Sequence, residues 1–141
     1  MVVDPDRSTL ERVERELALG FGADFRIRGE HASEAALDVL ADAAAHEAPV
    51  ALVLAGPRLD GTSGAELLRR ARSLHPDTRR ALLIGWGGWA DPPTADAVTA
   101  AMALGDADYY VLCPWRHGDQ LFRRTIAEFL HEWSRECPLG P

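Results

Sequence analysis

Short apolar runs alternate along this chain with longer stretches in which apolar residues recur at helical spacing. The most continuous run, 50–55, has no polar side chain, which predicts a central parallel strand buried on both faces. The remaining runs predict four further strands, over 1–3, 25–28, 81–84 and 109–112. The stretches between them predict helices from near Ser8 to the glycines at 20 and 22, over 33–45, over 65–74, from Pro92 to about Leu104, and over 120–134.

Five strands alternating with five helices predict an open parallel sheet with helices on both faces. In such sheets, ligands and chemistry gather at the carboxyl ends of the strands. The loops that follow Val3, Ala55, Ile84 and Leu112 are therefore the places to look for functional residues.

The composition of the chain excludes several classes of function. The chain has 141 residues, 47% of them hydrophobic, which suits a single domain; we expect it to span 1–135, with a tail over 136–141. All 15 basic side chains are arginine, so mechanisms that need a lysine amine are excluded. The net charge of −7 argues against nucleic acid and anionic membranes as partners. Cys113 and Cys137 belong to no metal or redox motif, and no leader is apparent, so a reduced, cytoplasmic chain is expected.

The predicted strand ends carry a recognisable set of motifs: 2–6 (VVDPD), 52–56 (LVLAG) with Arg58-Leu59 and Ser63-Gly64, 82–85 (LLIG) and 108–115 (DYYVLCPW). Together they resemble the receiver domain of bacterial response regulators, over essentially the whole chain. That resemblance implies a flavodoxin-like, doubly wound α/β fold with five parallel strands in the order 2-1-3-4-5 and five helices. More narrowly, 108–115 and 129–133 (FLHEW) look like the receiver domains at the N-terminus of some thioredoxin-reductase-like flavoproteins.

Receivers of this family are phosphorylated on an aspartate after the third strand, and that aspartate binds Mg²⁺ together with an acidic pair after the first strand. A hydroxyl after the fourth strand and a lysine before a proline after the fifth contact the phosphoryl group. Aligned on this pattern, the phosphoacceptor position falls on Gly56, the second acid on Pro5, the hydroxyl on Ile84 and the lysine on Cys113. Asp4 is the aligned acid that remains.

The sequence therefore predicts a degenerate receiver, or pseudo-receiver, that is not an enzyme, performs no phosphotransfer and needs no cofactor. Asp4 and Asp6 are weak candidates for a cation, although acids before a helix are also ordinary capping residues. Cys113 could be a reactive thiol, but no lysine exists to lower its pKa, so a buried, inert thiol is favoured.

A surface for a partner or ligand is expected at the aromatic residues of the fourth and fifth strand loops, namely Trp86, Trp89, Tyr110 and Trp115. The leading hypothesis is a phosphorylation-independent signalling module that works by protein–protein contact through helix four, strand five and helix five. The resemblance suggests a homodimer there, or a thioredoxin-reductase-like flavoprotein as partner. The alternative is a small-ligand sensor that uses the vacated pocket. A further arginine group (Arg69, Arg70, Arg72, Arg79, Arg80) is interpreted as a solvated helix face balanced by Glu66.

Overall fold

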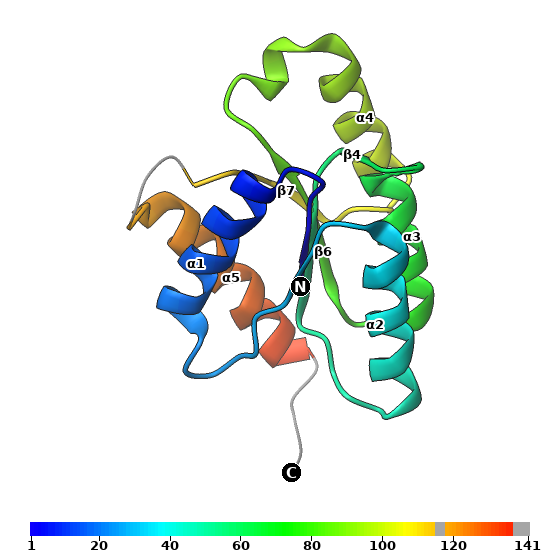
Figure 1. Ribbon diagram of the computed structural model, residues 1–141, viewed down its shortest axis with the longest axis vertical. Helices are drawn as coiled ribbons and strands as arrows, with labels where there is room; N and C mark the ends of the chain where they lie inside the picture. The colour runs from blue at the N-terminus through cyan, green and yellow to red at the C-terminus, as the bar shows by residue number, and fades with distance from the viewer. Residues whose placement is uncertain (115–117, 137–141) are drawn as a thin grey trace.

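The computed structural model describes residues 1–114 and 118–136, and it shows an α/β fold with helices on both faces of one parallel sheet (Figure 1). The main sheet has five strands in the order β2-β1-β3-β6-β7, and every neighbouring pair is parallel. Because β6 and β7 are the fourth and fifth strands of this sheet, the predicted order is confirmed. Its strands are β1 (Val2–Val3), β2 (Gly29–Glu30), β3 (Leu52–Ala55), β6 (Arg79–Ile84) and β7 (Tyr109–Leu112).

Two helical layers cover the sheet. On one face, α1 (Arg7–Phe21) and α5 (Gln120–Glu136) pack around a core that includes Val13, Leu54 and Ile126. On the other face lie α2 (Ser33–Ala45), α3 (Gly64–Leu74) and α4 (Pro92–Ala103), around a core that includes Leu40 and Leu82. Both faces of the central strand β3 are buried, as its apolar run predicts.

The structure corrects several predicted elements. The segment 25–28 is not a strand; β2 begins at Gly29 because its neighbour β1 begins only at Val2, so the preceding residues have no strand to pair with. The predicted loop 56–64 contains a small antiparallel hairpin, β4 (Arg58–Leu59) and β5 (Thr62–Ser63), and the aromatic loop contains a 3₁₀ turn, η1 (Gly88–Ala90). Near the end of α1, the apolar residue Leu19 is 65% exposed.

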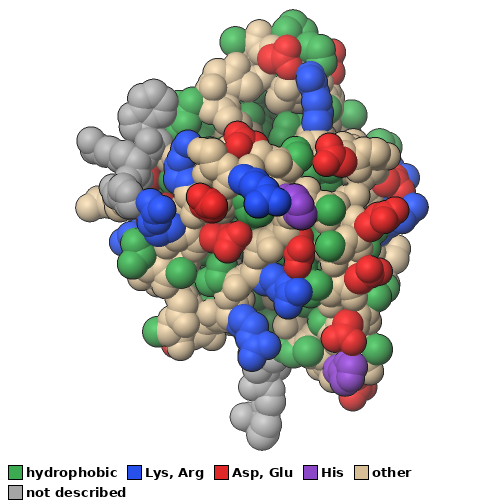
Figure 2. Space-filling model, viewed as in Figure 1, with side chains coloured by type: hydrophobic (Ala, Val, Ile, Leu, Met, Phe, Trp, Pro, Cys, Tyr) green, Lys and Arg blue, Asp and Glu red, His purple; other side chains and the backbone are tan. Residues whose placement is uncertain are grey.

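The surface mixes charges of both signs. Figure 2 shows arginine and acidic side chains interspersed over one face, with no continuous basic patch on that face. Within the described residues, no helix is long and apolar enough to cross a bilayer.

Candidate functional site

The four strand ends named by the sequence meet at one edge of the sheet. Gly56 follows β3 and its N–H donates to the Val3 carbonyl at 3.0 Å. Cys113 follows β7 and its N–H donates to the Ile84 carbonyl at 2.8 Å. The carboxylate of Asp4 lies beside Gly56 and contributes to the electrostatic environment of the Cys113 thiol. The topology thus brings together the predicted site residues Asp4, Gly56, Ile84 and Cys113.

The space above Gly56 is taken by Asp4. A Cβ atom built on Gly56 would lie 2.6 Å from the Asp4 Oδ2 atom, closer than real Cβ contacts allow. A phosphoacceptor side chain at this position would therefore require the Asp4 carboxylate to move. On the other side, Gly64 begins α3 so close to the Gly56 carbonyl that a Cβ on Gly64 would lie 2.0 Å from that oxygen. The helix packs directly against the backbone of the aligned acceptor position.

The acids after β1 make local hydrogen bonds. Asp4 Oδ1 accepts from the Asp6 N–H at 2.9 Å, and Asp6 in turn caps α1 by accepting from the Ser8 N–H at 3.0 Å. The capping interpretation is confirmed for Asp6. Pro5, at the second acidic position, is exposed. Among the described residues there is no group of three or more His, Cys, Asp and Glu side chains that could hold a metal ion.

Burial disfavours the charged forms of the two titratable groups at this site. It raises the pKa of Asp4, an effect that the Asp6 N–H bond partly offsets. It also raises the pKa of Cys113 to about 11, and the nearby Asp4 carboxylate adds to this shift. The Cys113 thiol is therefore protonated at neutral pH, which is the state of an inert buried cysteine.

Ile84 replaces a hydroxyl with a side chain that is only 1% exposed. The loop after β6 packs on it so tightly that a Cβ on Gly88 would lie 2.4 Å from Ile84 Cγ2. Ile84 thus serves as part of the core beneath the aromatic loop, with no polar group to offer a phosphoryl oxygen.

The aromatic residues form a ridge beside the site. Trp86 Nε1 donates to the Cys113 carbonyl at 2.8 Å, which ties the loop after β6 to the end of β7. Trp89 meets Tyr110 edge-on with ring centroids 5.0 Å apart. Trp86, Trp89 and Tyr110 are 50%, 43% and 42% exposed. Trp115 lies outside the described residues. We call the first three the aromatic ridge.

Two features near the site were missed by sequence reasoning. Glu16, only 1% exposed on α1, pairs with Arg123 Nη2 at 3.2 Å and accepts the Gly118 N–H at 3.0 Å, so it fixes the start of α5 against α1. The sequence signal for Glu16 was an acidic residue on the apolar side of a predicted helix. Arg58 of β4 pairs with Asp91 at 3.2 Å, which joins the hairpin to the start of α4.

The predicted solvated arginine group is wrong in part. Arg69 and Arg70 do pair with Glu66, as expected. Arg80, however, is 6% exposed and donates to the Gly105 and Asp106 carbonyls and to Asp108. A buried guanidinium needs several hydrogen-bond acceptors, and the turn before β7 supplies them. Arg80 thereby holds this turn in place.

Comparisons with solved structures identify the fold. The chain is similar to an adenylate cyclase structure from Rhodopirellula baltica (21% identity, TM-score 0.72, covering 96% of this chain and 88% of that one). It is also similar to the signal receiver domain of an HD domain-containing protein from Pseudomonas fluorescens Pf-5 (24% identity, TM-score 0.70, covering 96% of this chain and 88% of that one). A third similar structure is a CheY-like response regulator receiver domain protein from Methanospirillum hungatei JF-1 (22% identity, TM-score 0.70, covering 96% of this chain and 94% of that one).

No family model matches the chain, and no curated protein matches it significantly. Because the identities are below 25%, the likeness establishes the fold: this chain has the fold of response regulator receiver domains.

Proposed function

We propose that this chain is a receiver-like signalling module that acts by protein contact and carries out no phosphoryl transfer or other catalysis. The fold of receiver domains supports the signalling class. The absence of phosphoryl transfer is supported by the contact between Gly56 and Asp4. The aligned acceptor position has no side chain, and the Asp4 carboxylate occupies the space that an acceptor side chain would need. Ile84 and Cys113, both buried, offer neither the hydroxyl nor the cation that a phosphoryl group requires.

The proposal is tested with acetyl phosphate and Mg²⁺. We expect the intact mass of the protein to stay unchanged under conditions that phosphorylate an active receiver, and beryllofluoride with Mg²⁺ to leave its spectra unchanged. The variant Asp60→Asn is the matched control, because Asp60 is an exposed acid in the β4–β5 turn of the same loop. A stoichiometric phosphoryl adduct on the wild type would refute the proposal, and loss of that adduct in Asp60→Asn would identify a substitute acceptor.

The partner surface belongs to the same proposal. The residues of the aromatic ridge come from β7 and from the loop that leads into α4, which are parts of the expected α4–β7–α5 interface. Exposed tryptophan and tyrosine are the residues that most often supply binding energy at interfaces. We propose a homodimer or a thioredoxin-reductase-like flavoprotein as the occupant of this face. Isothermal titration against such a flavoprotein, with sedimentation of the chain alone, distinguishes the two.

A small-ligand sensor in the vacated site is the weaker alternative. Asp4 crowds Gly56, and the Trp86 indole is already hydrogen-bonded to Cys113, so these groups are engaged within the chain. Tryptophan fluorescence titrated with a pool of metabolites tests this alternative, which predicts a saturable change that Trp86→Phe removes.

A further inference from the structure

The outer side of α2 carries a row of like charges. Glu34, Asp38 and Asp42 follow one another at four-residue spacing, all three are exposed, and α2 contains no basic residue. Figure 2 shows acidic side chains one below another where Figure 1 draws α2. Residues four apart on a helix are neighbours, so these acids repel one another, and Asp42 lies at the negative end of the helix dipole. We call these three residues the acidic stripe.

The charge of the acidic stripe is poorly neutralised within the chain. Glu34 and Asp38 form no ion pair with any residue that the structure describes. Asp42 has the His46 ring 3.5 Å away, and that pair is charged only when the imidazole is protonated. The acidic stripe therefore destabilises its own helix, and positive charge from another molecule would offset this repulsion.

The neighbouring helix α3 carries the opposite charge. Its three arginines, Arg69, Arg70 and Arg72, are all exposed, and we call them the arginine stripe. Arg69 and Arg70 share one carboxylate, that of Glu66, at 2.8 and 3.4 Å. Arg69 also reaches Asp106, whereas Arg72 pairs with no acid in the described part of the chain. Three guanidinium groups thus have two carboxylates between them, which leaves a positive surplus on this helix.

The two stripes lie at the same height. Figure 1 shows α2 and α3 side by side on one face of the sheet, and both run in the same direction because each connects parallel strands. His75 follows α3, and its Nε2 atom lies 2.8 Å from the Leu40 carbonyl oxygen, which places the end of α3 level with the middle of α2. Counted back from this bond along both helices, Arg70 comes within about one turn of Glu34 and of Asp38.

Opposite charges at equal height make this face self-complementary. A two-fold axis that runs along the helices, between α2 and α3, places α2 of each copy on α3 of the other and keeps the heights equal. A two-fold axis across the helices would instead place the acidic stripes on each other. The remaining exposed residues of α2 are Ala41 and Ala45, so no bulky side chain keeps the two helices apart.

We propose that two copies of this chain associate through α2 and α3 about such an axis, with the acidic stripe of each copy on the arginine stripe of the other. The dimer is weak, because an exposed ion pair contributes little and both copies carry a net charge of −7. We expect a dissociation constant between about 10 μM and 1 mM. The aromatic ridge lies on other elements, so failure of this proposal and failure of the proposed function are distinguishable.

The sign of the salt dependence is the first test. Sedimentation equilibrium of the whole chain, at concentrations up to about 1 mM, should show dimers in about 0.1 M salt and at least tenfold weaker association in about 1 M salt. The screening length falls from about 10 Å to about 3 Å over this range, so the ion pairs across the interface weaken. Association through the apolar ridge should persist or strengthen, because salt screens the repulsion between the net charges.

A charge swap is the second test. Asp38→Arg and Arg70→Glu each place like charges across the interface, so each variant alone should associate at least tenfold more weakly than the wild type. An equal mixture of the two variants restores opposite charges at both contacts of the dimer. The mixture should therefore associate within about threefold of the wild type. Both side chains are exposed, and circular dichroism verifies that the variants fold.

Matched controls lie on α1, which packs on the other face of the sheet. Glu11→Arg and Arg12→Glu make the same changes of charge at exposed positions and should leave the association unchanged. Trp89→Ser should also leave it unchanged, which separates this dimer from association through the aromatic ridge. The proposal is overturned if the wild type shows no dimer up to about 1 mM in low salt, if the two swapped variants associate as the wild type does, or if their mixture fails to restore association.

Discussion

At the scale of single residues, the aligned phosphorylation site consists of groups that are either buried or engaged within the chain. Gly56 leaves room for Asp4, Ile84 belongs to the core, and Cys113 is 7% exposed. Burial raises the pKa of both Asp4 and Cys113. Burial disfavours the charged form of Asp4, the one acid left at the aligned positions, so the site is poorly suited to hold Mg²⁺.

Asp4→Asn should stabilise the protein at neutral pH. A raised pKa in the folded state means that the charged carboxylate disfavours folding, and the amide keeps an oxygen to accept the Asp6 N–H. Thermal unfolding from pH 3 to 8 checks this: the advantage should shrink as the pH falls through the raised pKa and vanish below the ordinary value of 3.8. Asp6→Ala should instead lose about 1 kcal/mol through its helix cap. A variant less stable than wild type at neutral pH would contradict the expectation.

Cys113 should react slowly with alkylating agents. A rise in pKa from 9.0 to about 11 lowers the thiolate fraction near neutral pH by about a hundredfold, and burial slows access further. Iodoacetamide kinetics in a Cys137→Ser background report on this thiol alone, and unfolding in urea provides the reactive control. Fast alkylation of the native protein would instead support the interpretation of Cys113 as a reactive thiol.

At the scale of secondary-structure elements, polar contacts between neighbouring elements position the loops at the site. Glu16 connects α1 to Gly118 and to Arg123 of α5, and the pair of Arg58 with Asp91 connects the β4–β5 hairpin to α4. Helical periodicity identifies α1 but does not indicate which polar residue on it is buried. That depends on α5, whose contact with α1 is a long-range one.

Glu16→Ala should destabilise the protein by about 2–4 kcal/mol, because it leaves a partly buried arginine and a backbone N–H without their acceptor. Chemical denaturation measures the loss. Glu11→Ala is the matched control, since Glu11 lies on the exposed side of the same helix and should change the stability by less than about 0.5 kcal/mol. Equal effects of the two substitutions would show that the Glu16 contacts contribute nothing specific.

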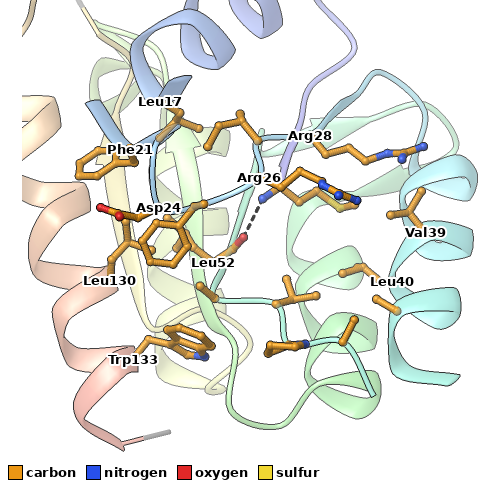
Figure 3. Close-up of a pocket in the computed structure, with 18 of the residues that line it drawn as sticks. Leu17, Phe21, Asp24, Arg26, Arg28, Val39, Leu40, Leu52, Leu130 and Trp133 are labelled. Atoms are coloured by element: carbon orange, nitrogen blue, oxygen red, sulfur yellow. Dashed lines mark hydrogen bonds between the residues drawn. The ribbon is translucent and has the colours of Figure 1, made fainter. Parts of the chain in front are cut away.

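At the scale of the whole molecule, the proposed interface lies at one end of the sheet. The aromatic ridge stands beside the candidate site, at the carboxyl ends of β6 and β7. The opposite end of the sheet, at the amino ends of the strands, has a cavity of about 530 Å³ lined by α1, α2 and α5 (Figure 3).

Trp89→Ser should weaken association through the α4–β7–α5 face by about 2 kcal/mol, or roughly thirtyfold, because the indole packs on Tyr110 at the centre of the ridge. Sedimentation over a range of concentrations, or titration with the flavoprotein, measures the change. Leu19→Ser is the control, since Leu19 is an exposed apolar residue of α1, which is not one of the elements of the proposed interface. Unchanged association of Trp89→Ser would place the interface elsewhere.

The local pattern of apolar and polar residues was sufficient to predict many of the secondary-structure elements of this protein. The continuous apolar run at 50–55 identified the central strand, and the ranges 33–45 and 109–112 agree with α2 and β7. The residues at Gly56, Ile84 and Cys113 could be assigned to the strand ends because parallel sheets place those ends at one edge. The absence of lysine already excluded the usual phosphoryl contact.

Only the tertiary contacts decided which side chains fill the site and which groups pair. Asp4 fills the space above Gly56 because β1 and β3 lie side by side, and Arg80 is buried because the turn before β7 packs over it. The segment 25–28 has the pattern of a strand, yet a strand forms only where a neighbour supplies hydrogen bonds, and the neighbouring β1 begins only opposite Gly29. The sequence pattern indicates which secondary structure each segment favours, whereas burial and strand pairing depend on residues far away in the chain.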